Sequence, residues 1–257
     1  MEAHEYQRMA DAEERHFWFR GSRQVIFTWL GAALADLGSA AKVDGRGRLD
    51  LVDIGAGTGG TLLAIGRRFE GLDAYGVEAS PIALDIAHKR GVDVQAGALP
   101  DLPLSSASAD VAIALDVFEH VDDDVAAMAE VRRVLRPGGR LIATVPALQW
   151  LWSDHDVALH HYRRYHRREL GERLGAAGFL VRRISYYNTF LLPPVAAVRL
   201  FGRLGPARAG PPRSDLVALP AVVNEPLAWL FAAERHVLAR ATLPVGASLI
   251  VDAAVAR

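Results

Sequence analysis

The sequence contains no cysteine, and its net charge is close to zero. Without cysteine, the 257-residue chain has no disulfide, no thiolate metal site and no cysteine nucleophile. Its 29 basic and 30 acidic residues give a formal net charge of −1. A protein that binds nucleic acid through its phosphates carries an excess of basic residues. The composition therefore argues against a nucleic-acid partner.

Long hydrophobic runs are also missing, although 51% of the residues are hydrophobic. No apolar run approaches the roughly 20 residues that a membrane-spanning helix needs. Residues 1–15 are charged and lack the apolar core of a secretory signal. We therefore expect a soluble, cytoplasmic protein that consists of one α/β domain with an additional elaboration.

Residues 49–60 have the pattern of a buried strand that ends in a glycine loop. The run 49–54 is apolar except for Asp50 and Asp53, as in a central parallel strand. Glycine then recurs at alternate positions before a helix predicted over 61–69. Glycine lets the backbone approach a ligand closely, and the free N–H groups at the start of the helix point towards that ligand. We expect a cofactor to bind here.

Two cofactor classes use this geometry, and the glycines alone fit both. Gly55, Gly57 and Gly60 have the spacing of the dinucleotide fingerprint, whereas Asp53 followed by alternating glycines matches the loop that binds S-adenosylmethionine. Asp53 favours the second class, because a carboxylate repels a pyrophosphate and attracts an ammonium or sulfonium group. An NAD(P)-dependent oxidoreductase with the same sheet topology remains the alternative function.

Four motifs, in order along the chain, carry a resemblance to a known family. They are Asp53–Gly59, Val77–Glu78, Leu115–His120 and Leu135–Gly139. With these motifs the sequence resembles the class I S-adenosylmethionine-dependent methyltransferases, in particular the group with a ubiquinone/menaquinone-type methyltransferase domain. The resemblance covers residues 49–146. It implies transfer of a methyl group, by in-line displacement, to a small-molecule or lipid-like acceptor.

The resemblance implies an α/β fold with a doubly wound, mostly parallel sheet of seven strands, the last of them antiparallel. We expect a helical cap over 1–48, which in the resembled group folds over the cofactor as a lid, and a helical insert over 189–244. The Rossmann-like domain is then formed by 49–188 and 245–257. Hydrophobic patterning predicts the strands at 49–54, 72–78, 92–96, 110–115, 140–145, 179–187 and 247–255.

The resemblance also assigns residues to the cofactor. Asp53 and Glu78 are expected at its opposite ends, since Glu78 closes the second strand and can accept both ribose hydroxyls. Trp18 can stack on the adenine or the sulfonium, and Arg20 can pair with the cofactor carboxylate; the aromatics around Trp18 equally suit docking of the N-terminal helices onto the sheet. Related proteins often carry an aspartate where Ala98 stands, so adenine recognition here falls to the backbone. The predicted set is Trp18, Arg20, Asp53, Gly55, Ala56, Gly57, Gly59, Glu78, Ala79, Ala98, Leu99, Asp116 and Val117.

The loop after the fifth predicted strand combines Trp, His, Tyr and Arg, and four of the nine histidines fall between 155 and 166. We predict that this loop borders the acceptor, and that a histidine acts as general base for an oxygen acceptor. His155 and Asp156 with His160 or His161 also offer metal ligands, but their spacing matches no strong metal pattern, and no metal is predicted. The base candidates are His120, His155 and His161. The substrate candidates are Trp152, His155, His161, Arg164, Tyr165, Tyr187 and Asn188.

The insert carries two further expectations. Glu234 falls on the buried stripe of a helix predicted over 225–240, so it needs either a partner, such as an arginine from 163–168, or an edge position near solvent. The arginine-containing stretch 189–214 suits a peripheral membrane contact, and the insert equally suits a cap over the pocket or a homodimer contact. A non-catalytic, membrane-peripheral cofactor-binding protein is therefore a third functional hypothesis.

Overall fold

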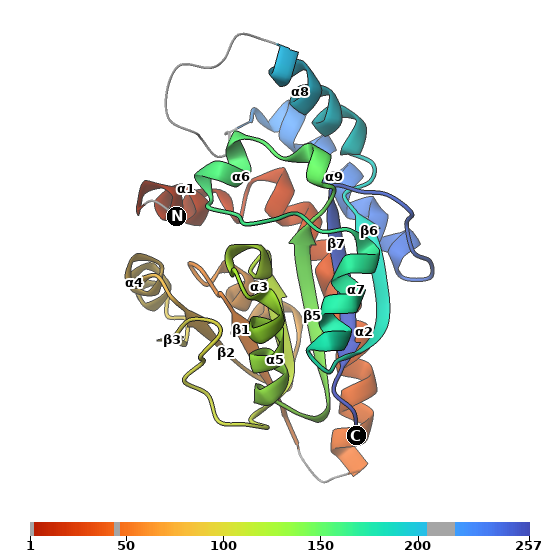
Figure 1. Cartoon of the computed structure of the whole chain (residues 1–257). Coiled ribbons are helices and arrows are strands. Elements are labelled where there is room, and N and C mark those ends of the chain that lie inside the picture. Colours follow the sequence, from red (N-terminus) through yellow and green to blue (C-terminus); the bar gives the residue numbers. More distant parts are fainter. Residues whose placement is uncertain (1–2, 44–46, 205–218) are drawn as a thin grey trace.

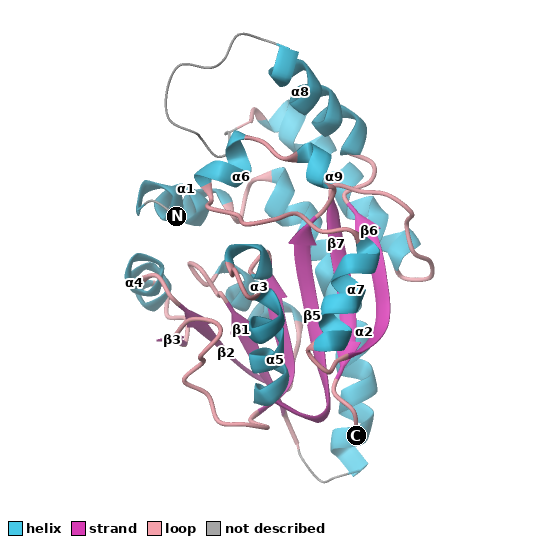
Figure 2. Cartoon of the chain, viewed as in Figure 1, coloured by secondary structure: helices cyan, strands magenta, loops and turns pink. Residues whose placement is uncertain are grey.

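A seven-stranded sheet forms the centre of the chain (Figure 2), with the strand order β3-β2-β1-β4-β5-β7-β6. The computed structural model describes residues 3–43, 47–204 and 219–257. β7 runs antiparallel to both of its neighbours, and the remaining pairs are parallel. The predicted fold class is therefore confirmed. The strands are β1 (Leu49–Ile54), β2 (Leu72–Glu78), β3 (Val94–Ala96), β4 (Ala109–Leu115), β5 (Leu135–Pro146), β6 (Leu180–Tyr187) and β7 (Ser248–Ala254).

Helices cover both faces of the sheet, because alternate residues of the central strands point to opposite sides. Leu51 of β1 packs under one group of helices, and Val52 under the other. The first group is α2 (Phe17–Val43), α3 (Gly60–Arg68), α4 (Pro81–Lys89) and α9 (Ala221–Leu238), and the second is α5 (Asp124–Val134) and α7 (Arg167–Ala176). The remaining helices are α1 (Ala3–Ala12), η1 (Phe118–His120), η2 (Gln149–Leu151), α6 (Asp154–Ala158) and α8 (Leu192–Leu204).

The strand order reverses between β1 and β4, and this reversal positions the site. β1 pairs with β2 on one side and with β4 on the other, and Ile54 at its end lies opposite Val77 and Ala114. The loops that follow β1, β2 and β4 therefore meet at one edge of the sheet. Open α/β sheets bind ligands at such a reversal, outside the carboxyl ends of the strands.

The fifth strand is longer than the predicted 140–145. It begins at Leu135, which pairs with Ala109, so α5 ends at Val134. The aromatic residues around Trp18 belong to α2, which begins at Phe17. Ser80 is the N-cap of α4, and its hydroxyl accepts a hydrogen bond from the Ala83 N–H at 3.4 Å.

The insert helix α9 packs lengthwise along α2 (Figure 1). Trp18 lies 5.4 Å from Phe231 between ring centroids, and the Trp29 indole N–H donates to the Leu238 carbonyl at 3.2 Å. Gly21 is required at this contact, because a Cβ there would lie 2.6 Å from Phe231. α9 therefore belongs to the layer that covers the sheet.

Glu234 has a different partner from the predicted arginine. It is fully buried, and its Oε1 accepts a hydrogen bond from the Phe190 N–H at 2.7 Å. Burial raises the pKa of Glu234, although these backbone hydrogen bonds oppose the shift. The expectation of an arginine from 163–168 is therefore wrong, because the turn after β6 brings its own N–H groups to the carboxylate.

Among the helices of the described residues, none combines the length and the apolar character that crossing a membrane requires. Part of the stretch predicted to contact a membrane, residues 205–214, lies outside the described residues.

Candidate active site

The glycine loop turns tightly at the carboxyl end of β1. Gly55, Gly57 and Gly59 have φ values of 73°, 55° and 82°, in the left-handed region that glycine tolerates and most residues do not. The loop ends at Gly59, which is the N-cap of α3. The backbone is thus folded back over the strand end and presents the start of α3 to the same edge of the sheet.

Asp53 is a buried carboxylate beside this loop. Its residue exposure is 2%, and no hydrogen bond or ion pair from the described residues reaches the carboxylate. Burial raises the pKa of Asp53 well above its usual value, and the negative charges of Glu78 and Glu13 raise it further. A carboxylate in such surroundings is stabilised by a cationic ligand.

Glu78, at the end of β2, is held in a fixed orientation. Its Oε2 accepts the Gly57 N–H and its Oε1 accepts the Ser80 N–H, both at 2.8 Å. Each carboxylate oxygen has a second lone pair that remains available to a ligand hydroxyl. Glu78 can therefore accept two neighbouring hydroxyl groups, as a ribose presents them.

The N-terminal helix α1 lies over the glycine loop (Figure 1). Met9 is close enough that a Cβ on Gly57 would lie 3.1 Å from its methyl group. Glu13, just after α1, accepts a hydrogen bond from the Thr58 hydroxyl at 3.0 Å and pairs with Arg90. The Glu13 carboxyl group therefore occupies the N-terminus of α3, where a dinucleotide places its pyrophosphate.

Gly60 provides the space for Glu13, and this gives a testable prediction. A Cβ at Gly60 would overlap the Glu13 carboxyl group, whereas a Cβ at Gly66 in the same helix would meet nothing within 4 Å. We expect Gly60→Ala to displace the Glu13 carboxyl group from Thr58 and Arg90 and so to destabilise the protein by about 1 kcal/mol, and Gly66→Ala to stabilise it by about 0.5–1 kcal/mol. Urea unfolding measures both changes. Equal effects of the two variants would contradict this packing.

The structure places Trp18 and Arg20 in the α2–α9 contact. The Arg20 guanidinium forms a two-point ion pair with Glu225, at 2.5 and 2.9 Å. Arg23, one turn further along α2, lies closer to the loop, with its Nη1 3.5 Å from the Gly60 carbonyl. Burial lowers the pKa of Arg23. Arg23 is therefore the arginine of this segment that contacts the start of α3, although the sequence alone does not distinguish it from Arg20.

The other predicted cofactor residues line the same edge. Asp116 follows β4 with φ 54°, and its Oδ1 accepts the Thr144 hydroxyl at 3.2 Å. Burial raises the pKa of Asp116, and the Thr144 hydrogen bond opposes this shift. Val117 packs against Gly55, and the Gly97 N–H donates to the Glu78 carbonyl at 3.0 Å. Ala56, Ala79, Ala98 and Leu99 lie in the turns between these anchor points.

The three predicted base candidates come together beside this edge. The His161 ring lies 4.6 Å from His120 and 6.1 Å from His155 between centroids. His161 Nδ1 is 3.0 Å from Asp156 Oδ1, and Arg164 makes a two-point ion pair with the same carboxylate at 2.8 and 3.0 Å. Burial favours a higher pKa for Asp156, but these partners outweigh it and lower the pKa.

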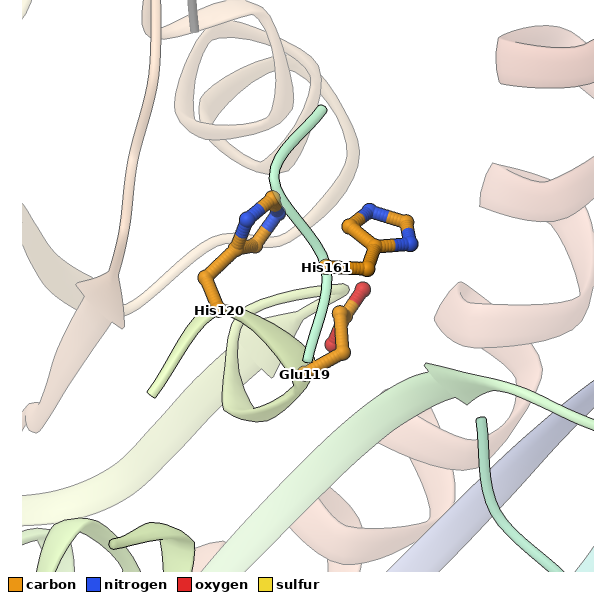
Figure 3. Close-up of side chains that lie close together, drawn as sticks. All are labelled: Glu119, His120 and His161. Atoms are coloured by element: carbon orange, nitrogen blue, oxygen red, sulfur yellow. The ribbon is translucent and has the colours of Figure 1, made fainter. Parts of the chain in front are cut away.

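Glu119 joins this group, which the sequence did not indicate (Figure 3). Its carboxyl group is fully buried, and neither oxygen has a hydrogen-bond partner among the described residues. Burial raises the pKa of Glu119 well above its usual value, and Asp116 adds to the effect. Burial and the neighbouring His161 lower the pKa of His120 to about 4. One ligand atom each from Glu119, His120 and His161 lie within 4.8 Å of one another.

Two of the predicted substrate residues, Arg164 and Tyr165, make contacts within the fold. The Arg164 guanidinium forms an ion pair with Asp156, and the buried Tyr165 hydroxyl donates to Asp124 Oδ2 at 2.7 Å. Tyr187, buried and stacked on Phe231, lies close to Asp116, and Trp152 is half-buried. Asn188 is fully buried, and neither atom of its amide has a partner among the described residues. A polar ligand group is the partner that such an amide lacks.

The sequence of the central part of the chain matches known proteins. Residues 52–143 match the model of a methyltransferase domain. The chain is 34% identical over 171 residues to a probable S-adenosylmethionine-dependent methyltransferase from Mycolicibacterium smegmatis, which covers 65% of this chain and 61% of that relative. The chain thus spans about three fifths of the length of this curated relative.

Solved structures share the fold at low sequence identity. A putative methyltransferase in complex with the Trm112 activator of Haloferax volcanii aligns with a TM-score of 0.58 and 18% identity, over 99% of this chain and 94% of that one. A second solved structure is a geranyl diphosphate C-methyltransferase from Streptomyces coelicolor in complex with Mg²⁺, geranyl diphosphate and S-adenosyl-L-homocysteine. It aligns with a TM-score of 0.53 and 19% identity, over 81% of this chain and 73% of that one.

Proposed function

We propose that the chain transfers a methyl group from S-adenosylmethionine to a small-molecule or lipid-like acceptor; residues 52–143 match the model of a methyltransferase domain, and a solved methyltransferase shares the fold. The observation that carries this proposal is the buried Asp53 carboxylate beside the glycine loop, which no hydrogen bond or ion pair from the described residues reaches. The ammonium group of the cofactor is the cation that this carboxylate lacks. In the geranyl diphosphate enzyme, the same fold holds S-adenosyl-L-homocysteine.

The residues at the site fit each part of this cofactor. Asp53 would face the ammonium group, Glu78 would accept the ribose hydroxyls, and Arg23, whose Nη1 lies 3.5 Å from the Gly60 carbonyl, would be a cation for the carboxylate. When bound, the cofactor supplies an electrophilic methyl group on a sulfonium. The task of the protein is to hold the acceptor in line with that methyl group, at about 3 Å.

The acceptor is proposed to lie between Asp116 and the histidine group. His120, His155 and His161 would provide imidazole nitrogens for an oxygen acceptor, and the Asn188 amide, which has no hydrogen-bond partner among the described residues, is a further candidate contact. Asp156 orients His161 through its Nδ1, so that Nε2 is the nitrogen that remains available. A purely non-catalytic cofactor protein would have no need for an oriented imidazole next to the cofactor.

The nicotinamide alternative is disfavoured by charge. Glu13 occupies the start of α3, where the pyrophosphate would bind, and Asp53 and Glu78 add two further carboxylates around the loop. Three carboxylates around the glycine loop would repel the diphosphate of a nicotinamide cofactor.

Cofactor binding tests the proposal directly. We expect S-adenosylmethionine and S-adenosylhomocysteine to bind in isothermal titration calorimetry and to raise the melting temperature, because a ligand stabilises the state that binds it. NADH and NADPH should cause neither change. Binding of a nicotinamide cofactor, with no heat from S-adenosylhomocysteine, would overturn the proposed function.

A further inference from the structure

We propose that Glu119, His120 and His161 bind one divalent first-row transition-metal ion. Glu119 and His120 lie together in η1, shortly after β4, and His161 comes from the loop between α6 and α7 (Figure 3). The Tyr162 N–H donates to the Glu119 carbonyl at 2.8 Å, which holds this loop against η1. The three side chains, from two segments distant in sequence, converge on one point.

Glu119 supplies the main evidence for a missing cation. The residue has no exposed surface, and both carboxylate oxygens lack a hydrogen-bond partner within the described ranges. A buried carboxylate in this state is costly unless a cation or hydrogen-bond donors compensate it. The nearby Arg164 guanidinium is already engaged with Asp156 and the Ala147 carbonyl. A metal ion between Glu119 and the two imidazoles would provide the compensation.

Both histidines are oriented as metal ligands usually are. Asp156 accepts the Nδ1–H of His161, which leaves the lone pair on Nε2, and a ring nitrogen of His120 bonds to the Leu159 backbone. A hydrogen bond from the second ring nitrogen to a carboxylate or carbonyl fixes the tautomer and orientation of metal-binding histidines. Arg164 in turn holds Asp156 at 2.8 and 3.0 Å, so that this support is rigid.

The ligand set indicates the class of metal. Two imidazole nitrogens and one carboxylate suit Zn²⁺, Fe²⁺, Co²⁺ or Mn²⁺, whereas Mg²⁺ and Ca²⁺ prefer oxygen ligands throughout. The three ligand atoms lie within 4.8 Å of one another. Bonds of about 2.0–2.2 Å to a single ion would bring such atoms to roughly 3.3 Å. The His161 side chain is 5% exposed and held by Asp156, so small rotations of the Glu119 and His120 side chains would make this adjustment.

This inference rests on the proposed function and makes it more specific. Asp116 precedes Glu119 by three residues and lies within electrostatic range of both Glu119 and His161, so the metal would border the acceptor position. Three protein ligands leave coordination positions open for an acceptor oxygen, whose acidity the metal raises. The acceptor class is therefore a molecule that offers a hydroxyl or carboxylate oxygen. His120 and His161 would then act as metal ligands, and His155, the third base candidate, stays outside the ligand set.

Cobalt binding tests the site without an activity assay. We expect the metal-free protein to bind one Co²⁺ per chain and to develop visible d–d absorption. Glu119→Gln and His161→Ala should each weaken binding at least tenfold, and Asp156→Asn should weaken it 10- to 100-fold through the loss of orientation. His166→Asn is the matched control, since His166 is exposed, lies outside the cluster and is the N-cap residue of α7, a position that asparagine favours. Its affinity should be unchanged.

Two further measurements separate the possible failures. Zn²⁺ should raise the melting temperature of the wild-type protein but not that of Glu119→Gln, so the proposal remains testable if another variant does not fold. Absence of Co²⁺ and Zn²⁺ binding to the wild type, or equal binding by all variants, would overturn the metal site. S-adenosylhomocysteine should bind to Glu119→Gln as tightly as to the wild type. If the wild-type protein itself did not bind S-adenosylhomocysteine, the proposed function would be overturned instead.

Discussion

Asp53→Asn is expected to weaken S-adenosylmethionine binding by about 10- to 100-fold and, at the same time, to stabilise the ligand-free protein. The first effect follows from loss of a charge-assisted hydrogen bond in a buried site, which contributes about 1.5–3 kcal/mol. The second follows from removal of a buried carboxylate that lacks a partner and is repelled by Glu78 and Glu13. Calorimetry and thermal unfolding of the same preparation measure both effects.

The stabilisation should depend on pH in a defined direction. Burial raises the folded-state pKa of Asp53, so the unfolded chain loses this proton first, near pH ~4, and the native state loses stability as the pH rises through the higher value. The melting-temperature gap between Asp53→Asn and the wild type should therefore be small below pH ~4 and widen as the pH rises. A gap that is constant with pH would show that ionisation of Asp53 is not its cause.

Asp252→Asn is the matched control for these measurements. The Asp252 carboxylate is also part of the sheet, but it forms an ion pair with Arg140, at 2.8 Å for the Arg140 Nε contact. Its removal should lower stability and leave cofactor affinity unchanged. If both variants changed affinity alike, Asp53 would be acting through the sheet rather than through the ligand.

Asp124→Ala is expected to cost about 3–5 kcal/mol of stability, because it leaves several buried partners without an acceptor. Asp124 is 1% exposed and lies at the first turn of α5. Its carboxylate accepts the Tyr165 hydroxyl at 2.7 Å and Arg173 at 2.6 Å, and Arg163 lies 3.4 Å away. This one side chain therefore fastens the histidine-bearing loop and α7 to α5.

Asp123→Ala is the control one residue away. Asp123 caps the same helix by accepting the Ala126 N–H at 3.0 Å, so its loss should cost only about 1 kcal/mol. Urea unfolding followed by circular dichroism measures both variants. Similar losses for the two would mean that Asp124 acts as a local helix residue and not as the anchor of the loop.

In the N-terminal cap, the side chains that reach the glycine loop and the end of β2 come from α1 and the residue just after it. Glu13 fills the start of α3, Met9 lies over Gly57, and Tyr6 lies close to Glu78 and Ser80. The predicted lid therefore contributes acidic and apolar side chains around the glycine loop and the end of β2. The predicted roles of Trp18 and Arg20 stay predictions; in the structure these two residues contact Phe231 and Glu225.

The sequence by itself determined the sheet and the glycine-loop edge of the site. The central strands β1 and β4 are mostly apolar runs of six and seven residues, and Asp53, Glu78 and Asp116 stand at or next to strand ends. Hydrophobic periodicity predicts where a strand ends, and therefore which residues follow it at the edge of the sheet. The chain order of parallel strands then brings these ends to one edge.

Only the tertiary structure decided which side chains meet across long separations. Glu119 is next to the predicted residue His120 in sequence. Its carboxylate is buried without a hydrogen-bond partner among the described residues because of the way the loop bearing His161 lies on η1. Arg164 and Tyr165 are residue types that often line pockets, but here they are buried, Arg164 against Asp156 and Tyr165 against Asp124. Glu234 is paired by the turn at Phe190. Such pairings depend on the relative placement of elements, which packing of the whole core determines and local periodicity does not encode.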